Sequence, residues 1–175
     1  MAITPSGIDY DLLTADDIQI IDFDGHKVEG TLKPSSEFRM HLDTYKQRPE
    51  FTSFIHTHAT YACTLAVLNQ PLVAIDYLVA YAGGKDVRVS KYASFGTAEL
   101  SQNALAAMEG RNAVILANHG LNVAGQELAD TFMEVEVLEF CCKLQVLAMS
   151  AGQPVILPDQ EMERMVEDFK HYGQK

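Results

Sequence analysis

The sequence Phe54-Ile55-His56-Thr57-His58 ends an apolar run and places two imidazoles two residues apart. Side chains alternate between the two faces of a strand, so residues i and i+2 point the same way. His56 and His58 can therefore bind one ion from one side. His119 follows a second strand-like run, residues 113–118, and can complete a set of three imidazole ligands. Three protein ligands suit a zinc site in which one coordination position stays open for chemistry.

A lone histidine near a strand end is more often a packing or surface residue than a metal ligand. His26, His41 and His171 stay in that class, because they fall in an expected hairpin, on a polar helix and in the tail. The pair in residues 56–58 is stronger evidence, since two neighbouring imidazoles in a core would each need a hydrogen-bond partner. The residues alone leave both interpretations open, a metal site or packed histidines.

Strand and helix patterns alternate along the chain on both sides of this motif. Besides the strand that ends at His56, strands are expected at residues 18–22, 27–29, 113–117 and 121–124, with Asp24-Gly25 as a hairpin turn. Helices are expected at about residues 34–48, 59–68, 97–108, 126–149 and 158–172. Interleaved strands and helices favour a layered α/β fold over a helical bundle.

The composition fits one folded domain over residues 1–175, with no linker, repeat or low-complexity segment. A formal net charge of -11 argues against nucleic acid as a partner, because phosphates require a basic face. No signal peptide is recognised, and no apolar stretch approaches the ~18 residues of a membrane span, so no membrane partner is expected. Three cysteines, two of them adjacent, do not form a disulfide framework, which favours the cytoplasm.

The segment Ser35-Ser36-Glu37 combines two hydroxyls with a carboxylate at the expected start of a helix. Free backbone N–H groups and the helix dipole favour anions at such a position. The segment can therefore bind a phosphate and supply an acid/base group beside it. A plain helix cap, with serine as the capping residue, is the alternative. It accounts for the serines but says little about Glu37.

Other chemistries find less support in the sequence. Gly83-Gly84-Lys85 lacks the spacing of a phosphate-binding P-loop and is expected to be a turn. The absence of a Gly-x-Ser-x-Gly elbow disfavours a serine hydrolase. Cys141 and Cys142 are neighbours in an expected helix and are interpreted as packing residues. Most lysines stand in polar sequence, which disfavours an imine-forming lysine.

Several short segments follow one another along the chain: Ile3-Thr4-Pro5-Ser6-Gly7, Pro34-Ser35-Ser36-Glu37, Arg48-Pro49-Glu50, Ile55-His56-Thr57-His58-Ala59, Tyr92-Ala93-Ser94-Phe95-Gly96-Thr97, Asn118-His119-Gly120-Leu121 and, in the tail, Phe169-Lys170-His171-Tyr172-Gly173. Each is weak alone, but the ordered set is highly specific. Together they resemble the class II aldolase/adducin family over essentially the whole chain.

The resemblance implies a three-layer α/β/α fold with a central, mostly antiparallel sheet. It also implies a homotetramer with active sites between subunits. Zinc is expected at His56, His58 and His119, with Glu37 as a fourth ligand that can move off the metal and act as acid and base. These roles come from the positions that match the family's motifs.

The resemblance also assigns the substrate side of the site. Four residues are expected to bind the phosphate of the substrate: Ser6, Gly7, Ser35 and Ser36. Tyr77 is expected to reach into the neighbouring subunit's site as a proton donor, although the residues around it alone indicate only core or interface. Phe95 and Tyr172 are expected to line the site from an adjoining chain.

The implied reaction is zinc-dependent retro-aldol cleavage of L-fuculose 1-phosphate, or a similar ketose 1-phosphate, to dihydroxyacetone phosphate and lactaldehyde, as in fucose catabolism. Zinc lowers the pKa of bound water from about 15.7 to roughly 7, on the order of 12 kcal/mol of charge stabilisation. A comparable effect would stabilise the enediolate of this reaction. Glu37 would carry the proton, and Tyr77 would serve the aldehyde oxygen.

Family members carry a further helix and a phosphate-binding loop before the segment that matches Ile3-Thr4-Pro5. Met1 stands just before that segment here, so we expect impaired activity or poor stability from these 175 residues alone.

Two alternatives remain within the same family. One is a related zinc enzyme, namely a pentulose-phosphate 4-epimerase, a methylthioribulose-phosphate dehydratase or a decarboxylase. Tyr77 and Tyr172 favour the aldolase over these. The other is a non-catalytic scaffold of the adducin type, which is disfavoured because such relatives can lack the metal ligands, whereas all three histidines are present.

Overall fold

The computed structural model describes residues 1–172, so Gly173 of the last resembling segment lies outside the described residues. Two compact units are distinguished: Met1–Pro49 with Ala93–Gln102, and Glu50–Tyr92 with the chain from Asn103 onward. Each unit has its own three-stranded sheet. The expected mixed α/β class is confirmed, and both sheets are antiparallel. Within residues 1–172 no helix has the length and apolar character to cross a membrane.

The first unit is built around a small sheet in the order β1-β2-β3, followed by one helix. Its elements are β1 (Ala2–Ile3), η1 (Tyr10–Leu12), η2 (Ala15–Asp17), β2 (Gln19–Ile21), β3 (Lys27–Glu29) and α1 (Phe38–Gln47). The hairpin expected at Asp24-Gly25 is confirmed. Asp22 Oδ1 accepts the backbone N–H groups of Asp24 (2.9 Å) and His26 (2.8 Å), and Gly25 takes the positive φ of 89° that the turn requires.

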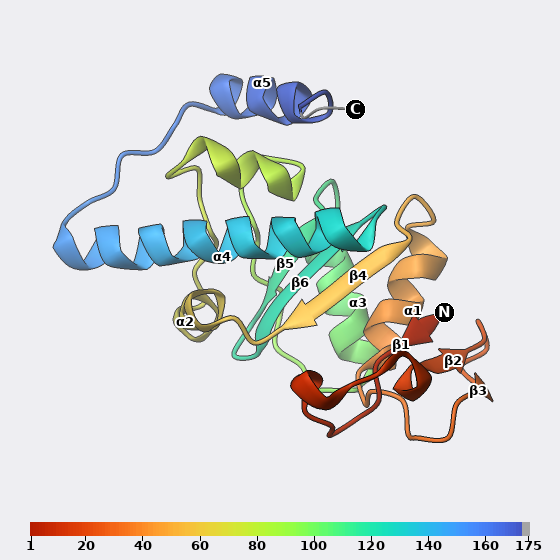
Figure 1. Cartoon of the computed structure of the whole chain (residues 1–175). Helices are drawn as coiled ribbons and strands as arrows, with labels where there is room; N and C mark the ends of the chain where they lie inside the picture. The colour runs from red at the N-terminus through yellow and green to blue at the C-terminus, as the bar shows by residue number, and fades with distance from the viewer. Residues whose placement is uncertain (173–175) are drawn as a thin grey trace. The chain divides into compact units, whose positions relative to one another are not determined.

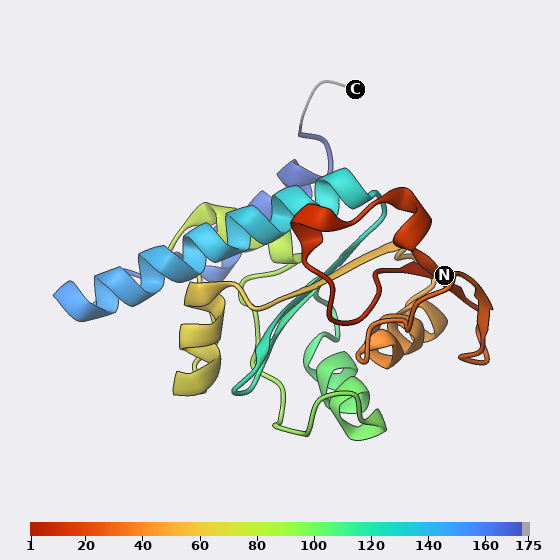
Figure 2. The ribbon, with the colours of Figure 1, turned by 60° about the horizontal axis from the view of Figure 1, so that its bottom comes forward.

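The second unit holds the sheet β4-β6-β5. Its elements are β4 (Ser53–Thr57), α2 (Thr60–Leu68), η3 (Tyr77–Ala82), β5 (Ala113–Leu116), β6 (Gly120–Gly125), α4 (Leu128–Ala151) and α5 (Asp159–Phe169). Helix α3 (Ala98–Ala107) begins in the first unit and ends in the second. Helix α4 runs along the sheet, and the short helix η3 lies between α4 and α5 (Figure 1). The turned view shows α4 and the three strands from a second side (Figure 2).

The core of the second unit explains why its elements could be recognised from sequence. Every residue of β5 is buried, so this strand has a continuous apolar run instead of an alternating one. Helix α4 buries Val135, Leu138 and the adjacent Cys141 and Cys142, which confirms that the two cysteines are packing residues. The buried side chain of Gln145 donates to the carbonyl of residue 71 and accepts the N–H of residue 73, both at 2.8–2.9 Å.

Some elements differ from the sequence expectation. The short strand β1 and the helix η3 were not anticipated, and α5 ends at Phe169 instead of Tyr172. Gly83 ends η3 with a positive φ of 76°, so the expected turn at Gly83-Gly84-Lys85 is confirmed.

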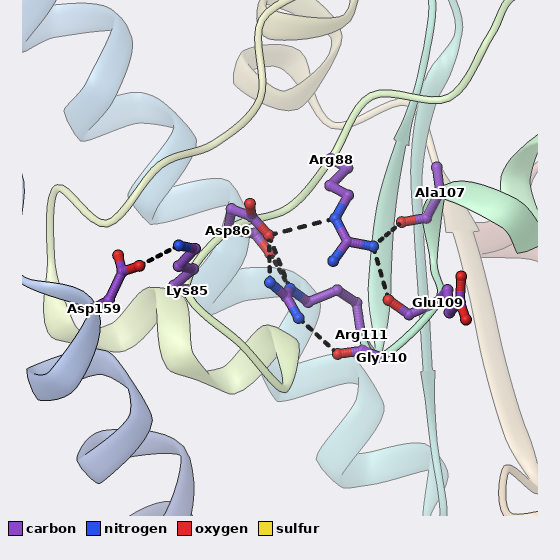
Figure 3. A network of polar contacts seen from close by, with 8 residues as sticks. All are labelled: Lys85, Asp86, Arg88, Ala107, Glu109, Gly110, Arg111 and Asp159. Carbon is purple, nitrogen blue, oxygen red and sulfur yellow. Dashed lines mark hydrogen bonds and ion pairs between the residues drawn. The ribbon is translucent and has the colours of Figure 1, made fainter.

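Polar contacts join the segment after η3, with Asp86 and Arg88, to the residues between α3 and β5 (Figure 3). The Arg111 guanidinium donates to the Asp86 carboxylate at 2.8 Å and to the carbonyl of Gly110. Arg88 closes the end of α3 by donating to the carbonyls of Ala107 and Glu109, at 3.2 and 2.7 Å. These bonds satisfy carbonyls that a helix end leaves without an intrahelical partner.

Candidate active site

The three expected histidines converge within the second unit. Their ring centroids are 5.0 Å apart for His56 and His58, 4.8 Å for His56 and His119, and 5.2 Å for His58 and His119. One nitrogen of each ring lies within 4.8 Å of those of the others. The Nε2 atoms of His56 and His58 are 3.2 Å apart. Two nitrogens on one tetrahedral zinc, each at about 2.05 Å, are about 3.3 Å apart, so this donor set fits such an ion.

The strand register brings these histidines together. Strand β4 pairs with β6 so that Thr57 faces Leu121, and β5 pairs with β6 so that Leu116 faces Gly120. The end of β4, the end of β5 and the start of β6 therefore meet at one edge of the sheet. His119 lies in the turn between β5 and β6, after Asn118 with a positive φ of 53°. Asparagine tolerates this left-handed conformation better than most residues.

Gly120 permits the close approach of the turn to β4. A Cβ atom added there would lie 2.5 Å from the carbonyl oxygen of Thr57 and 3.0 Å from Cδ2 of His58. Such a distance to a backbone oxygen is far below van der Waals contact, so the backbone would have to move. The glycine after His119 is thus a steric requirement of the histidine cluster.

Asn122 fixes the orientation of the first histidine. Its Oδ1 lies 2.8 Å from Nδ1 of His56, its direct partner in the β4–β6 register. An amide oxygen only accepts, so Nδ1 carries the proton and the lone pair of Nε2 stays available for a metal. Asn122 is 1% exposed. Hydrogen bonds of this kind hold metal-binding imidazoles in one tautomer and ring orientation.

The segment with Ser35, Ser36 and Glu37 lies in the first unit, just before α1. The expectations that a serine caps this helix and that Glu37 lies in its first turn are wrong. Glu37 is itself the N-cap residue, and its own side chain makes no cap hydrogen bond. The reason is local: Ser35 Oγ accepts the N–H of Glu37 at 3.3 Å, and the Ser35 carbonyl accepts the N–H of Phe38 at 3.1 Å. The hydroxyl is used in a tight turn that precedes the helix.

The residues expected to bind phosphate come from two segments that pair in the first unit. Ser6 donates its N–H to the Lys33 carbonyl at 2.9 Å, and Ser35 donates to the Thr4 carbonyl at 3.0 Å. Ser6-Gly7 and Ser35-Ser36 are thereby held side by side, and Gly7 has a positive φ of 74°. A Cβ added at Gly96 would lie 3.1 Å from the carbonyl oxygen of Ser36. The turn that contains Phe95 therefore lies beside the Ser35-Ser36 segment.

Tyr77 and Tyr172 gather around Phe169 in the second unit. Ring centroids of Tyr77 and Tyr172 lie 6.2 and 6.0 Å from that of Phe169, and Tyr81 stacks on Phe169 at 4.2 Å. We call these four residues the aromatic cluster. Tyr77 is 48% exposed and Tyr172 is 74% exposed, so both rings are open to a ligand or another chain.

The acid Glu134 from α4 lies close to the aromatic cluster. Burial, with a smaller contribution from the charge of Asp130, raises the pKa of Glu134 to about 7. Its Oε2 atom is buried and has no hydrogen-bond partner among the described residues. Burial and the nearby charges of Tyr172, Glu134 and Tyr77 also raise the pKa of Tyr81.

Comparison with known proteins identifies the family of this chain. Residues 1–146 match the family described as Class II Aldolase and Adducin N-terminal domain. The chain belongs to the class II aldolase/adducin family. The 5-methylthioribulose-1-phosphate/5-deoxyribulose-1-phosphate aldolase of Rhodospirillum rubrum is 44% identical over 173 residues, which are 99% of this chain and 78% of that protein. The 5-deoxy-D-ribulose 1-phosphate aldolase of Bacillus thuringiensis serovar kurstaki is 41% identical over 175 residues, 100% of this chain and 82% of that protein.

A solved structure of an L-fuculose 1-phosphate aldolase is 52% identical and superposes with a TM-score of 0.94 over 97% of this chain and 80% of that one. The fold is therefore that of the class II aldolases, and the protein is a class II aldolase, a lyase. Enzymes of this class depend on a metal ion, and the three histidines of this aldolase can hold one. Imidazole ligands suit zinc and several other transition metals.

Sequence reasoning missed three features of this aldolase's second unit. The contact of Asn122 with His56 depends on which strands pair and in which register, which no local pattern reveals. Tyr81 comes from the helix η3, which was not expected, and its stacking on Phe169 of α5 joins segments far apart in the chain. Glu134 is one of several acids on the helix expected at residues 126–149, and only its burial distinguishes it from them.

Proposed function

We propose that this class II aldolase cleaves a ketose 1-phosphate between C3 and C4 to dihydroxyacetone phosphate and a short aldehyde. The convergence of three imidazoles at metal-binding separations carries this proposal. The relatives named above support the substrate class, because all of them are named for ketose 1-phosphates. L-fuculose 1-phosphate would give lactaldehyde, and 5-deoxyribulose 1-phosphate would give acetaldehyde.

We assign zinc to His56, His58 and His119, with Glu37 as a fourth ligand. A bound zinc would act as a Lewis acid and stabilise the negative charge that develops when the C3–C4 bond breaks. In the cleavage direction the C4 hydroxyl loses its proton, the electron pair of the broken bond moves toward the C2 carbonyl, and C3 is then protonated. Glu37 would deliver the proton to C3, and Tyr77 would accept the proton that the C4 hydroxyl loses.

The phosphate of the substrate is assigned to the paired segments with Ser6, Gly7, Ser35 and Ser36. Hydroxyl and backbone N–H donors held at fixed positions are suited to an anion. Local donors must provide the attraction, because a net charge of -11 repels a phosphate ester at long range. Ser35→Ala and Ser36→Ala should raise KM for phosphate esters far more than they change zinc affinity. Equal effects on both would argue against this assignment.

We further propose a homotetramer in which Tyr77, Phe95 and Tyr172 complete the site of an adjoining subunit. Subunit mixing tests this arrangement. Glu37→Gln and Tyr77→Phe should each be inactive as pure proteins, and Glu37→Gln should keep its zinc-binding histidines. Dissociating and reassembling the two variants together should restore some activity, since a mixed interface can contain both intact residues. No recovery from mixtures shown by mass to contain both chains would refute shared sites.

The substrate is tested with a panel of ketose 1-phosphates and an enzymatic assay for dihydroxyacetone phosphate. L-fuculose 1-phosphate and 5-deoxy-D-ribulose 1-phosphate should differ in kcat/KM, and the larger value identifies the preferred aldehyde. Chelation should remove activity, and zinc should restore it. His58→Ala should abolish both zinc binding and turnover, whereas His171→Ala is the control, because that side chain is 77% exposed and lies outside the histidine cluster. No dihydroxyacetone phosphate from any ester would refute the proposal.

A further inference from the structure

Helix α2 starts two residues after His58 and lacks a capping side chain of its own. Its N-cap residue is Ala59, which has no side-chain oxygen, and no cap hydrogen bond is formed by that residue. The N–H groups of the first turn of a helix have no intrahelical acceptor. A serine, threonine, aspartate or asparagine at the N-cap normally accepts one of them, at the second or third helical position. In α2 these two positions are Tyr61 and Ala62.

Glu139 of α4 supplies the missing cap from a distant part of the chain. Its Oε1 accepts the N–H of Tyr61 at 2.8 Å, and its Oε2 accepts the N–H of Ala62 at 2.9 Å. One carboxylate thus satisfies both donors that a local cap would share. The negative charge also lies at the positive end of the α2 dipole. Helices α2 and α4 pack against each other (Figure 1).

Helix α2 is in turn bonded to the turn that carries His119. The thiol of Cys63, in the first turn of α2, donates to the carbonyl of His119 at 3.2 Å. One turn further along, the carbonyl of Ala66 accepts the N–H of Asn118 at 3.2 Å. The start of α2 therefore connects to two members of the histidine cluster, to His58 through two residues of chain and to His119 through hydrogen bonds.

We infer that Glu139 is a positioning residue for the metal site. It acts through α2: its carboxylate fixes the first turn, and the fixed turn holds His58 and the His119 loop at their separation. Without it the first turn would fray, and the two imidazoles would sample positions in which they cannot bind one ion together. The inference rests on the proposed metal site. Loss of outer-shell partners of metal ligands typically weakens metal affinity about 10- to 100-fold.

The test measures zinc affinity of the full chain by competition with a chromophoric chelator. Glu139→Ala should bind zinc about 10- to 100-fold more weakly than the wild type. Glu139→Gln keeps one oxygen acceptor and should lie between the two. Adding Ala59→Ser to Glu139→Ala should restore most of the affinity, because the serine hydroxyl can accept from the same N–H groups. This rescue separates capping from any direct effect of the Glu139 charge on the metal.

Two control variants on α4 make the outcome decisive. Glu136→Ala removes an exposed carboxylate one turn before Glu139 and should leave zinc affinity unchanged. Gln145→Ala removes two hydrogen bonds to the 71–73 loop and should lower Tm without changing zinc affinity. Faster amide exchange of residues 60–63 in metal-free Glu139→Gln would support the capping role independently of zinc.

The possible failures are distinguishable. A wild-type protein that binds no zinc would overturn the metal site and this inference with it. A wild type that binds zinc while Glu139→Ala binds it equally well would overturn the inference alone. Weakening by Gln145→Ala equal to that by Glu139→Ala would overturn it too, since general destabilisation would then explain both. If Glu139→Ala does not fold, Glu139→Gln and the double variant with Ala59→Ser give the same comparison.

Discussion

Replacing Glu134 with glutamine should change how the stability of this aldolase depends on pH. Burial is the main reason that the pKa of Glu134 rises from 4.5 to about 7, and the charge of Asp130 adds to it. Tyr81 faces the same region and is neutral over this range. The buried Oε2 atom has no partner among residues 1–172 that would stabilise the ionised form. Glutamine has the shape of the protonated acid and cannot ionise.

The sign follows from which state binds the proton more tightly. Between pH 4.5 and about 7 the folded protein keeps the Glu134 proton while the unfolded chain has lost it. The contribution of Glu134 to the free energy of unfolding therefore falls as pH rises through this window, and levels off above the folded pKa. A shift of about 2.5 units at about 1.36 kcal/mol each corresponds to roughly 3 kcal/mol. This figure is an upper limit, because Glu134 is not completely buried.

Urea unfolding at one protein concentration between pH 4.5 and 8 measures the effect. Glu134→Gln should match the wild type near pH 4.5 and exceed it by up to about 3 kcal/mol at pH 8. The exposed neighbour Glu136→Gln is the matched control and should follow the wild type at every pH. Other carboxylates titrate in both proteins and cancel in the difference. A difference between Glu134→Gln and the wild type that does not change with pH would refute the reasoning.

Three further predictions concern the second unit. Asn122→Leu removes the acceptor that orients the imidazole of His56, so it should lower zinc affinity about 10- to 100-fold in a chelator competition. Asn122→Asp keeps an acceptor and should bind zinc at least as tightly as the wild type. Gly120→Ala should destabilise by about 1–3 kcal/mol and disturb zinc binding, whereas Gly152→Ala, where an added Cβ meets nothing within 4 Å, should do neither. Asp86→Ala leaves the guanidinium of Arg111 without its carboxylate and should cost about 2–3 kcal/mol in urea unfolding, with zinc affinity unchanged.

Much of the fold could be predicted because its strongest elements have clear local patterns. Strand β5 is a continuous apolar run, and α4 repeats apolar residues at helical spacing over 24 residues. The two-residue spacing of His56 and His58 predicts that both side chains point to the same face of a strand, and this prediction needs no knowledge of the fold. The start of α1 could not be predicted, because Ser35 can either cap a helix or close a turn before it, and the local sequence does not decide between them.

The supporting residues of the site could not be predicted, because each depends on contacts between distant segments. Glu139 and the N–H groups it accepts are 77 and 78 residues apart in the chain. Asn122 and His56 are 66 residues apart. The raised pKa of Glu134 is a property of burial, which a helical pattern of acids does not reveal. Sequence thus indicates which groups can bind a metal, while packing determines how they are held.

The histidine cluster is secured by the hydrophobic core on the opposite face of the same sheet. In β6, Leu121 and Val123 are fully buried in the core that includes α4, while Asn122 between them points to the other face and meets His56. A slip of one residue between β4 and β6 would exchange these faces, so it would turn the apolar side chains away from this core and bring the polar asparagine into it. The free-energy cost of that exchange fixes the register. The same register sets the separation of His56 from the turn that carries His119, so the metal site is positioned by core packing.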